Sequence, residues 1–406
     1  MLAYLTGIRS PRHHPFSRRE RKESKTTSMV PPPPHHKPNS DGRREIATLH
    51  ARGGPYTTFN WHPAGHSLAL AAADGHLHYW DYTTEHLHDV GPVVEGVVIS
   101  LAFDPTSGRL ASATRGALAV SRRTSESHAL TIDTGDEGPT VVLWQPTEGY
   151  LISCDYDGTV RTWDPDSGYL IRQIHNSPHP LWGAAFEVID GLLAVACEDG
   201  TIKVWREEAG EEIGDITQHD GPVLDVAWKP RGNRQDALVL ASGSADGTVR
   251  IWLGPDPAKG SRSGHTIVLE RHTEKVTEVN FSSDGSLLAS TAIDGTTLLW
   301  DTVDWAFLCQ LPKLSAGTRV EFHPSSPVLA RFDIEQQMCD VWHLDAATLA
   351  GTDSAMEKRY RNAKVVLMGD SSVGKSGLAL VLTGHNYQAT ESTHGRKVWT
   401  FASTEV

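Results

Sequence analysis

Hydrophobic and polar residues follow a repeating unit along the middle of the chain. In each unit an apolar run precedes an Asp-Gly pair, and an alternating segment then leads to a Trp six residues after the Asp. The Asp residues are Asp74, Asp157, Asp199, Asp246 and Asp294, and the matching tryptophans are Trp80, Trp163, Trp205, Trp252 and Trp300. Asp-Gly favours a tight hairpin turn, because Gly accepts positive φ and Asp tolerates it. Alternation with a period of two is typical of half-buried strands, so each unit predicts a β-hairpin.

The spacing of the units predicts a propeller. Trp80 and Trp163 lie 83 residues apart, which is room for two units, and the later intervals are 42, 47, 48 and, up to Trp342, 42. A unit of about 40–45 residues with four strands is the size of a β-propeller blade. We therefore expect seven blades and a mainly β fold.

Two of the blades are degenerate. The second is expected to use the segments 101–105, 109–114 and 116–121, with Ser121 where the others have Trp, and the seventh to use 319–324, 328–332 and 339–342. An open ring would leave two sheet edges exposed. Because 45–49 is strand-like and has no blade of its own, we expect it to complete blade seven and close the ring.

These repeats resemble the WD40 family, whose Trp-Asp dipeptide is present at Trp80-Asp81, Trp163-Asp164 and Trp300-Asp301. The resemblance covers residues 44–345 and implies a scaffold that binds proteins or peptides on its flat faces. It also implies one buried chain of hydrogen bonds per blade. The sets are His219, Ser242, Asp246 and Trp252 in blade five, and His272, Ser290, Asp294 and Trp300 in blade six. A set repeated blade after blade indicates a structural role rather than a catalytic triad. Blades one, two and seven lack the full set and are expected to be less stable.

No catalytic residue is predicted in the propeller. The aromatic and His-rich segment with Tyr79, Tyr82, His86 and His88 is either a binding surface or ordinary surface. No Cys/His set has the spacing of a zinc site. The four cysteines form no CxxC pair, and three of them lie in apolar, strand-like runs, which indicates buried thiols in a reducing compartment.

Charge is distributed unevenly along the chain. The net charge is −13, but residues 1–44 hold ten Lys/Arg and three Asp/Glu, so the remainder carries −20. Such a body does not attract nucleic acid or an anionic membrane through its overall field, and basic proteins are favoured as partners. Residues 1–43, basic and proline-rich, are expected to be disordered, as a docking arm or as a simple leader. Without an apolar stretch of membrane-spanning length, the protein is expected to be cytoplasmic with no transmembrane segment.

A different motif follows a linker predicted at 346–360. An apolar run at 365–368 precedes the sequence Gly-Asp-Ser-Ser-Val-Gly-Lys-Ser from Gly369 to Ser376, and a second apolar run follows at 378–382. This is the GxxxxGK[ST] phosphate-binding loop between a strand and a helix. Its backbone N–H groups cradle phosphates, Lys375 reaches the β- and γ-phosphates, and the Ser376 hydroxyl ligates Mg²⁺.

Residues 361–406 resemble the start of a small GTPase of the Ras superfamily, closest to the Rab-like branch. The resemblance implies GTP or GDP with Mg²⁺ as ligands, Ser376 and Thr393 as metal ligands, and Tyr387 beside the guanine. The nucleotide-binding residues that it implies are Gly369, Ser372, Val373, Gly374, Lys375, Ser376, Gly377, Tyr387 and Thr393. Two features depart from the family: the loop between Tyr387 and Thr393 is one residue short, and His394 replaces an aliphatic residue.

The DxxG and NKxD motifs of that family do not follow before Val406. The segment is therefore expected to be an incomplete α/β domain, from a fragment or a truncated gene, that binds nucleotide weakly or not at all as it stands. Three functions stay open: a scaffold regulated by GTP binding and hydrolysis, a pure scaffold with an inactive GTPase remnant, and a P-loop ATPase of the signalling type.

Overall fold

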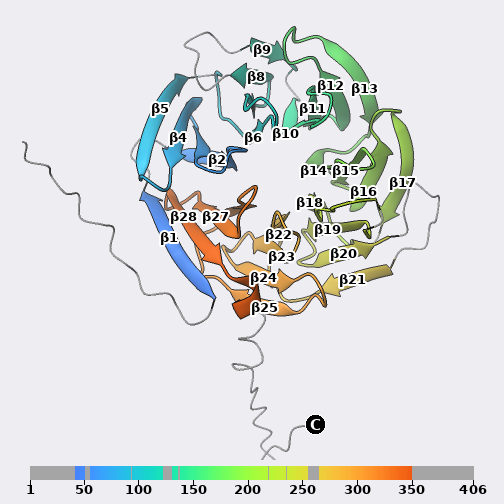
Figure 1. Cartoon of the computed structure of the whole chain (residues 1–406). Helices are drawn as coiled ribbons and strands as arrows, with labels where there is room; N and C mark the ends of the chain where they lie inside the picture. Colours follow the sequence, from blue (N-terminus) through green and yellow to red (C-terminus); the bar gives the residue numbers. More distant parts are fainter. Residues whose placement is uncertain are drawn as a thin grey trace, which may run out of the picture.

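The described part of the chain is a closed ring of seven small sheets. The computed structural model describes residues 42–50, 55–92, 94–121, 130–135, 138–217, 219–234, 236–254 and 265–349. Within these residues, 28 strands form seven four-stranded antiparallel sheets around a central axis (Figure 1). The prediction of a mainly β, seven-bladed propeller is confirmed.

Each blade runs from an inner strand at the axis to an outer strand at the rim. Blade one contains β2 (Tyr56–Trp61), β3 (Leu68–Ala72), β4 (His76–Asp81) and β5 (His86–Pro92). Blade two contains β6 (Ser100–Phe103), β7 (Leu110–Ala113), β8 (Ala117–Ser121) and β9 (Leu130–Asp133). Blade three contains β10 (Pro139–Trp144), β11 (Leu151–Asp155), β12 (Thr159–Trp163) and β13 (Leu170–Asn176).

The remaining blades repeat this order. Blade four contains β14 (Leu181–Glu187), β15 (Leu192–Cys197), β16 (Thr201–Arg206) and β17 (Glu211–Thr217). Blade five contains β18 (Val223–Trp228), β19 (Val239–Ser244), β20 (Val249–Leu253) and β21 (His265–Leu269). Blade six contains β22 (Val276–Phe281), β23 (Leu287–Ala292), β24 (Thr297–Asp301) and β25 (Phe307–Gln310). Blade seven contains β26 (Arg319–Phe322), β27 (Val328–Asp333), β28 (Met338–Leu344) and, from the start of the chain, β1 (Arg43–His50).

The two ends of the propeller close the ring as predicted. Strand β1 pairs antiparallel with β28, from Arg43 opposite Leu344 to His50 opposite Met338. The backbone N–H of Asp345 donates to the carbonyl of Gly42 at 2.8 Å, which extends this pairing by one bond. A helical turn at 346–349 follows, and Leu349 is buried against the core of blades six and seven. The packed structure thus includes the first four residues of the stretch predicted as a linker.

Neighbouring blades cover one another, and this explains the burial pattern. Every residue of the second strand is buried in all seven blades. Both faces of each strand lie against a sheet, so these strands are buried along their whole length, and the polar residues among them, such as Ser242 and Arg331, are hydrogen-bonded inside the blades. The Asp-Gly turns adopt the predicted conformation: Gly158 has φ 79°, and a Cβ there would lie 2.0 Å from the carbonyl oxygen of Ser177.

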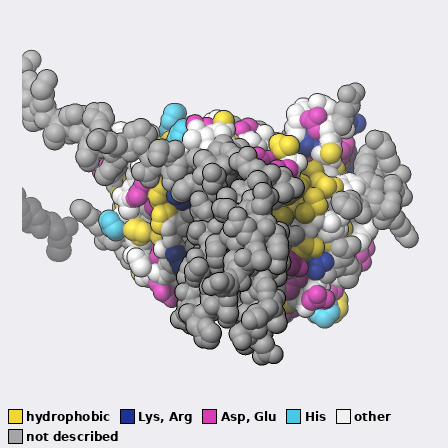
Figure 2. Space-filling model, turned by 90° about the horizontal axis from the view of Figure 1, so that it is seen from below, with side chains coloured by type: hydrophobic (Ala, Val, Ile, Leu, Met, Phe, Trp, Pro, Cys, Tyr) yellow, Lys and Arg dark blue, Asp and Glu magenta, His cyan; other side chains and the backbone are white. Residues whose placement is uncertain are grey.

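In a view from below, acidic side chains are scattered over the visible part of the rim, and hydrophobic side chains gather on its right-hand side (Figure 2). All four cysteines are free thiols, and three of them are buried. No helix among the described residues is both long and apolar enough to span a bilayer.

Candidate functional site

The predicted hydrogen-bond chain in blade five is present. His219 lies with Nδ1 2.8 Å from Asp246 Oδ2 and Nε2 2.7 Å from Ser242 Oγ, and the indole N–H of Trp252 donates to the same Oγ at 3.0 Å. Burial lowers the pKa of His219, which opposes the raising effect of Asp246. Burial also disfavours the charged Asp246, but hydrogen bonds from Thr248 and His219 outweigh it and lower its pKa to about 2.

Blade six keeps only part of this chain. His272 Nε2 lies 2.7 Å from Ser290 Oγ, and Trp300 donates to that hydroxyl at 2.9 Å. Asp294, however, accepts from Lys313 Nζ at 2.8 Å, and His272 Nδ1 is buried without a partner in the described structure. The expectation of a complete set in blade six is therefore wrong at Asp294, because a lysine 19 residues later in the chain takes the carboxylate.

In blade seven, a buried ion pair stands where blade five has its hydrogen-bonded set. In blade five, Ser242 stands two residues beyond the strand partner of Trp252, and the corresponding residue in blade seven is Arg331. Arg331 is fully buried, and its guanidinium donates through Nε to Asp340 Oδ1 at 3.0 Å and through a second nitrogen to Oδ2. It also donates to the carbonyl of Pro312 at 2.8 Å. The indole N–H of Trp342 has no hydrogen-bond partner in the described structure.

These buried sets do not form a catalytic site. A Ser-His-Asp triad needs a serine that a substrate can reach. Ser242 and Ser290 are both fully buried, and each accepts a Trp N–H. These sets are structural hydrogen bonds inside a blade, as predicted.

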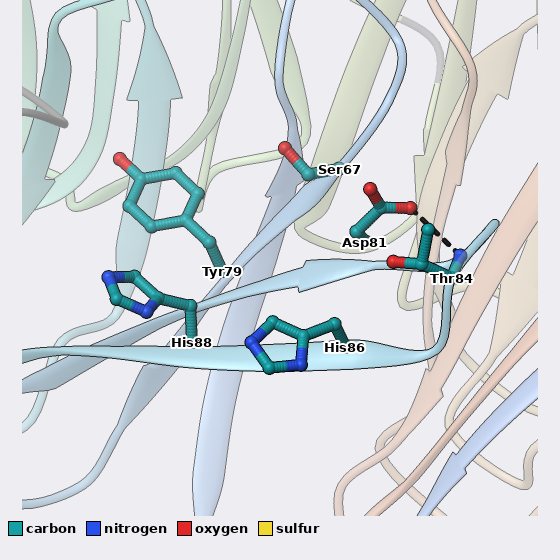
Figure 3. Close-up of a pocket in the computed structure, with 6 residues that line it drawn as sticks. All are labelled: Ser67, Tyr79, Asp81, Thr84, His86 and His88. Carbon is teal, nitrogen blue, oxygen red and sulfur yellow. Dashed lines mark hydrogen bonds between the residues drawn. The ribbon is translucent and has the colours of Figure 1, made fainter. Parts of the chain in front are cut away.

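A hollow on blade one is the best candidate for a ligand site in the described structure. It has a volume of about 480 Å³, and its lining residues are Ser67, Tyr79, Asp81, Thr84, His86 and His88 (Figure 3). Strands β4 and β5 place Tyr79 opposite His88 and Asp81 opposite His86. Directly opposed residues of an antiparallel pair project to the same face, so one hairpin supplies most of the lining.

The polar groups of the hollow differ in whether they already have hydrogen-bond partners within the protein. Asp81 Oδ1 accepts from Thr83 N–H at 2.9 Å, from the Thr83 hydroxyl at 2.6 Å and from Thr84 N–H at 3.1 Å, and the Thr83 hydroxyl contributes most to lowering its pKa. The Ser67 hydroxyl is buried and has no partner in the described structure. His86 and His88 are exposed at the mouth. The hollow therefore offers two imidazoles for hydrogen bonding, beside the buried ring of Tyr79.

Three of the four residues predicted for this surface line the hollow. Tyr82 does not: its ring packs edge-on against Trp61 at 5.4 Å. Ser67, Asp81 and Thr84 were missed, although the alternation of the hairpin contained a signal for Asp81, which shares a face with Tyr79. In the part of the chain that the structure describes, no group of three or more His, Cys, Asp or Glu residues could hold a metal ion.

The predicted nucleotide site lies outside the described residues. This holds for every residue assigned to it, from Gly369 to Thr393, including the metal ligands Ser376 and Thr393.

Comparison with known proteins agrees with the repeat pattern. The family model for the WD domain, G-beta repeat, matches residues 129–164, 167–206, 210–252 and 263–301. Each match ends at, or one residue after, a repeat Trp. Four WD40 repeats are thus matched within residues 129–301. They run from the outer strand of blade two to the third strand of blade six of the seven-bladed propeller.

Relatives are similar to this chain over parts of their length. Protein CIA1 of Arabidopsis thaliana is 38% identical over 102 residues, which are 24% of this chain and 28% of that protein. A probable cytosolic iron-sulfur protein assembly protein 1 of Candida glabrata is 33% identical over 138 residues, 32% of this chain and 39% of that protein. Striatin-4 of Homo sapiens is 27% identical over 194 residues, 45% of this chain and 23% of that protein. The chain thus spans well under half the length of these relatives.

The fold also has a close structural neighbour. The crystal structure of the β-propeller domain of Myceliophteria thermophila Cps50 (Swd1) superposes with a TM-score of 0.62 at 16% identity, covering 74% of this chain and all of that domain. At this identity the likeness supports the fold alone.

Proposed function

We propose that this protein is a scaffold whose propeller binds protein partners on its faces, linked to a segment that binds a guanine nucleotide with Mg²⁺. The observation that carries the scaffold is the closed ring itself. The Ser-His-Asp set of blade five is buried inside the blade, whereas the loops and the blade-one hollow are accessible to a partner. A rigid platform with loops at both ends suits binding better than chemistry.

The hollow on blade one supports recognition of a peptide. Its buried Ser67 hydroxyl lacks a partner, and its two histidines stand at the entrance. The exposed imidazoles of His86 and His88 are the groups that a peptide carbonyl or amide would bond.

The relatives support a scaffold without selecting the partner. One of them is named a probable cytosolic iron-sulfur protein assembly protein, another is named protein CIA1, and a third is a striatin. All three match over less than half of this chain. A cytoplasmic location for this chain is accordingly part of the proposal.

The nucleotide-binding part of the proposal is supported by the sequence Gly369–Ser376. The loop matches every fixed position of GxxxxGK[ST] and is preceded and followed by apolar runs. GTP would be held through its phosphates by Lys375 and through Mg²⁺ by Ser376 and Thr393. Hydrolysis of GTP is proposed only for a domain completed beyond Val406, and a scaffold with an inactive remnant is the alternative.

Binding of a fluorescent GTP analogue to the naturally expressed protein, with and without Mg²⁺, tests this part. We expect Mg²⁺-dependent binding that Lys375→Ala and Ser376→Asn abolish or strongly weaken while thermal unfolding of the propeller is unchanged. Competition with unlabelled GTP and ATP separates a GTPase from a signalling ATPase, because equal displacement by ATP contradicts the small-GTPase assignment. If the unsubstituted protein binds no nucleotide, the pure scaffold stands instead.

A further inference from the structure

The tryptophan Trp182, on the inner strand of blade four, occupies a bulge position that holds threonine in blades one, three and six. The inner strands of blades one, three and six each have a bulge near their start, at Thr57, Thr140 and Thr277. Each threonine hydroxyl donates to a carbonyl of the neighbouring strand within its own blade, at 3.2, 2.9 and 3.2 Å. In blade four the bulge residue is Trp182, which is only partly buried. Bulges redirect side chains, and here the redirected side chain is a large indole.

Trp182 is held in place by residues of two adjacent Asp-Gly turns. Its indole N–H donates to the carboxylate of Glu198, in the turn of blade four. Its ring meets the ring of Tyr156, in the turn of blade three, edge-on with centroids 5.9 Å apart and an interplanar angle of 81°. Tyr156 is 46% exposed. The two blades are neighbours in the ring (Figure 1), so Tyr156, Trp182 and Glu198 form one cluster, which we call the aromatic cluster.

The charges beside the aromatic cluster are predominantly negative. The two turns contribute Asp155, Asp157, Glu198 and Asp199. Arg161 bonds both Asp155 and Asp157, so it is already neutralised, and Lys203 is paired with Glu212 and Asp215 on the outer side of blade four. Exposed His179 is the remaining basic group near Asp199. One carboxylate oxygen of Asp155 is buried without a partner in the described structure.

We propose that the aromatic cluster is the docking site for an arginine side chain of a basic protein segment. A guanidinium attracts the faces of Trp and Tyr and forms charge-assisted bonds with a carboxylate. The cluster supplies both kinds of group, and the surrounding carboxylates favour a cationic partner over a neutral or acidic one. This inference rests on the proposed scaffold function and specifies the chemistry of one partner.

A labelled peptide with alternating Arg and Gly residues tests the site, with an otherwise identical peptide that has Gln for Arg as the neutral probe. By fluorescence anisotropy, the full chain should bind the Arg peptide in preference to the Gln peptide. Trp182→Thr, which installs the bulge residue of blades one, three and six, and Tyr156→Ala should each weaken Arg-peptide binding by about 3- to 30-fold. Glu198→Gln should weaken it as well.

Matched controls distinguish this site from general acidity or misfolding. Tyr169→Ala removes an aromatic ring that is 76% exposed on the same blade, and Glu211→Gln removes a 66% exposed carboxylate of blade four. Both should leave binding unchanged, and all variants should unfold at the temperature of the unsubstituted chain. Equal affinity for the two peptides, or unchanged binding in Trp182→Thr and Tyr156→Ala, overturns the assignment of the cluster but leaves the scaffold proposal intact. The scaffold proposal itself fails if the propeller retains no protein partner of any kind.

Discussion

The imidazole Nδ1 of His219 lies 2.8 Å from Oδ2 of Asp246. This contact completes a buried chain of hydrogen bonds in blade five. In blade six the corresponding contact is missing, because Asp294 pairs with Lys313. Two blades with almost the same residues therefore hold their histidines differently, and the difference has consequences for stability as the pH falls.

Acid should destabilise the propeller partly through His272. Burial lowers the pKa of His272 from 6.5 to about 4, so the folded chain keeps this imidazole neutral while the unfolded chain takes up a proton below pH 6.5. Stability attributable to His272 is therefore full above pH 6.5 and is lost as the pH falls towards 4, by roughly 2–3 kcal/mol. Chemical unfolding measured between neutral pH and about pH 4.5 should show a smaller loss of stability in His272→Gln, whose amide can still hydrogen-bond the Ser290 hydroxyl. The exposed His343→Gln is the control, and an equal change in both variants contradicts the assignment.

Removing the blade-five tryptophan should destabilise the fold strongly. Trp252 is buried and packs into the core of blades four and five. We expect Trp252→Ala to lower the free energy of unfolding by roughly 3–5 kcal/mol through the lost contacts and the cavity left behind. Urea unfolding measures this, with exposed Tyr169→Ala as the control. A loss below about 1 kcal/mol would show that this Trp is not the core of its blade.

Removing one partner of the blade-seven ion pair should lower the free energy of unfolding strongly, whereas replacing both partners with apolar residues should lower it much less. Arg331→Met leaves the Asp340 carboxylate buried without its partner, so we expect a loss of about 3–5 kcal/mol. The double variant Arg331→Met, Asp340→Leu removes both charges and should recover most of that loss. Arg234→Met, which breaks the exposed pair with Asp190, should change stability by less than about 0.5 kcal/mol. A double variant no more stable than Arg331→Met would contradict this account.

Closure by β1 should set the stability of the ring. Deleting residues 1–50 removes β1 and exposes the edge of β28, so calorimetry should show a clearly lower unfolding temperature, and size-exclusion chromatography should show self-association. Deleting residues 1–41 keeps β1 and serves as the matched control, with an unfolding temperature equal to that of the full chain. Equal unfolding temperatures for the two deletions would show that β1 does not stabilise the ring.

The fold was predictable because its signals are local and repeated. The Asp-Gly turns, the Trp spacing and the unpartnered strand at 45–49 each specify a short-range feature, and the ring follows from their sum. Ser121 on β8 shows that even a blade without its Trp could be located from the strands around it.

Side-chain partners were less predictable, because they depend on positions distant in sequence. Nothing near Asp294 indicates that Lys313 will take its carboxylate, and nothing near Arg331 marks it as a buried replacement for serine. The hollow on blade one was only partly foreseen, since the pairing of Asp81 with His86 depends on the register across the β4–β5 turn. The cluster of Tyr156, Trp182 and Glu198 joins two blades, so no single repeat contains it.

The central claim is that the propeller, through its faces, is the part of this chain that binds protein partners. Affinity capture with the naturally expressed protein, followed by chemical cross-linking and mass spectrometry, tests this most directly. The account predicts cross-links from captured proteins to the loops of the propeller faces, and loss of those proteins in the destabilised Trp252→Ala variant. The account is contradicted if no protein is retained, or if Trp252→Ala, shown to be unfolded, retains the same proteins with cross-links confined to residues outside 42–349.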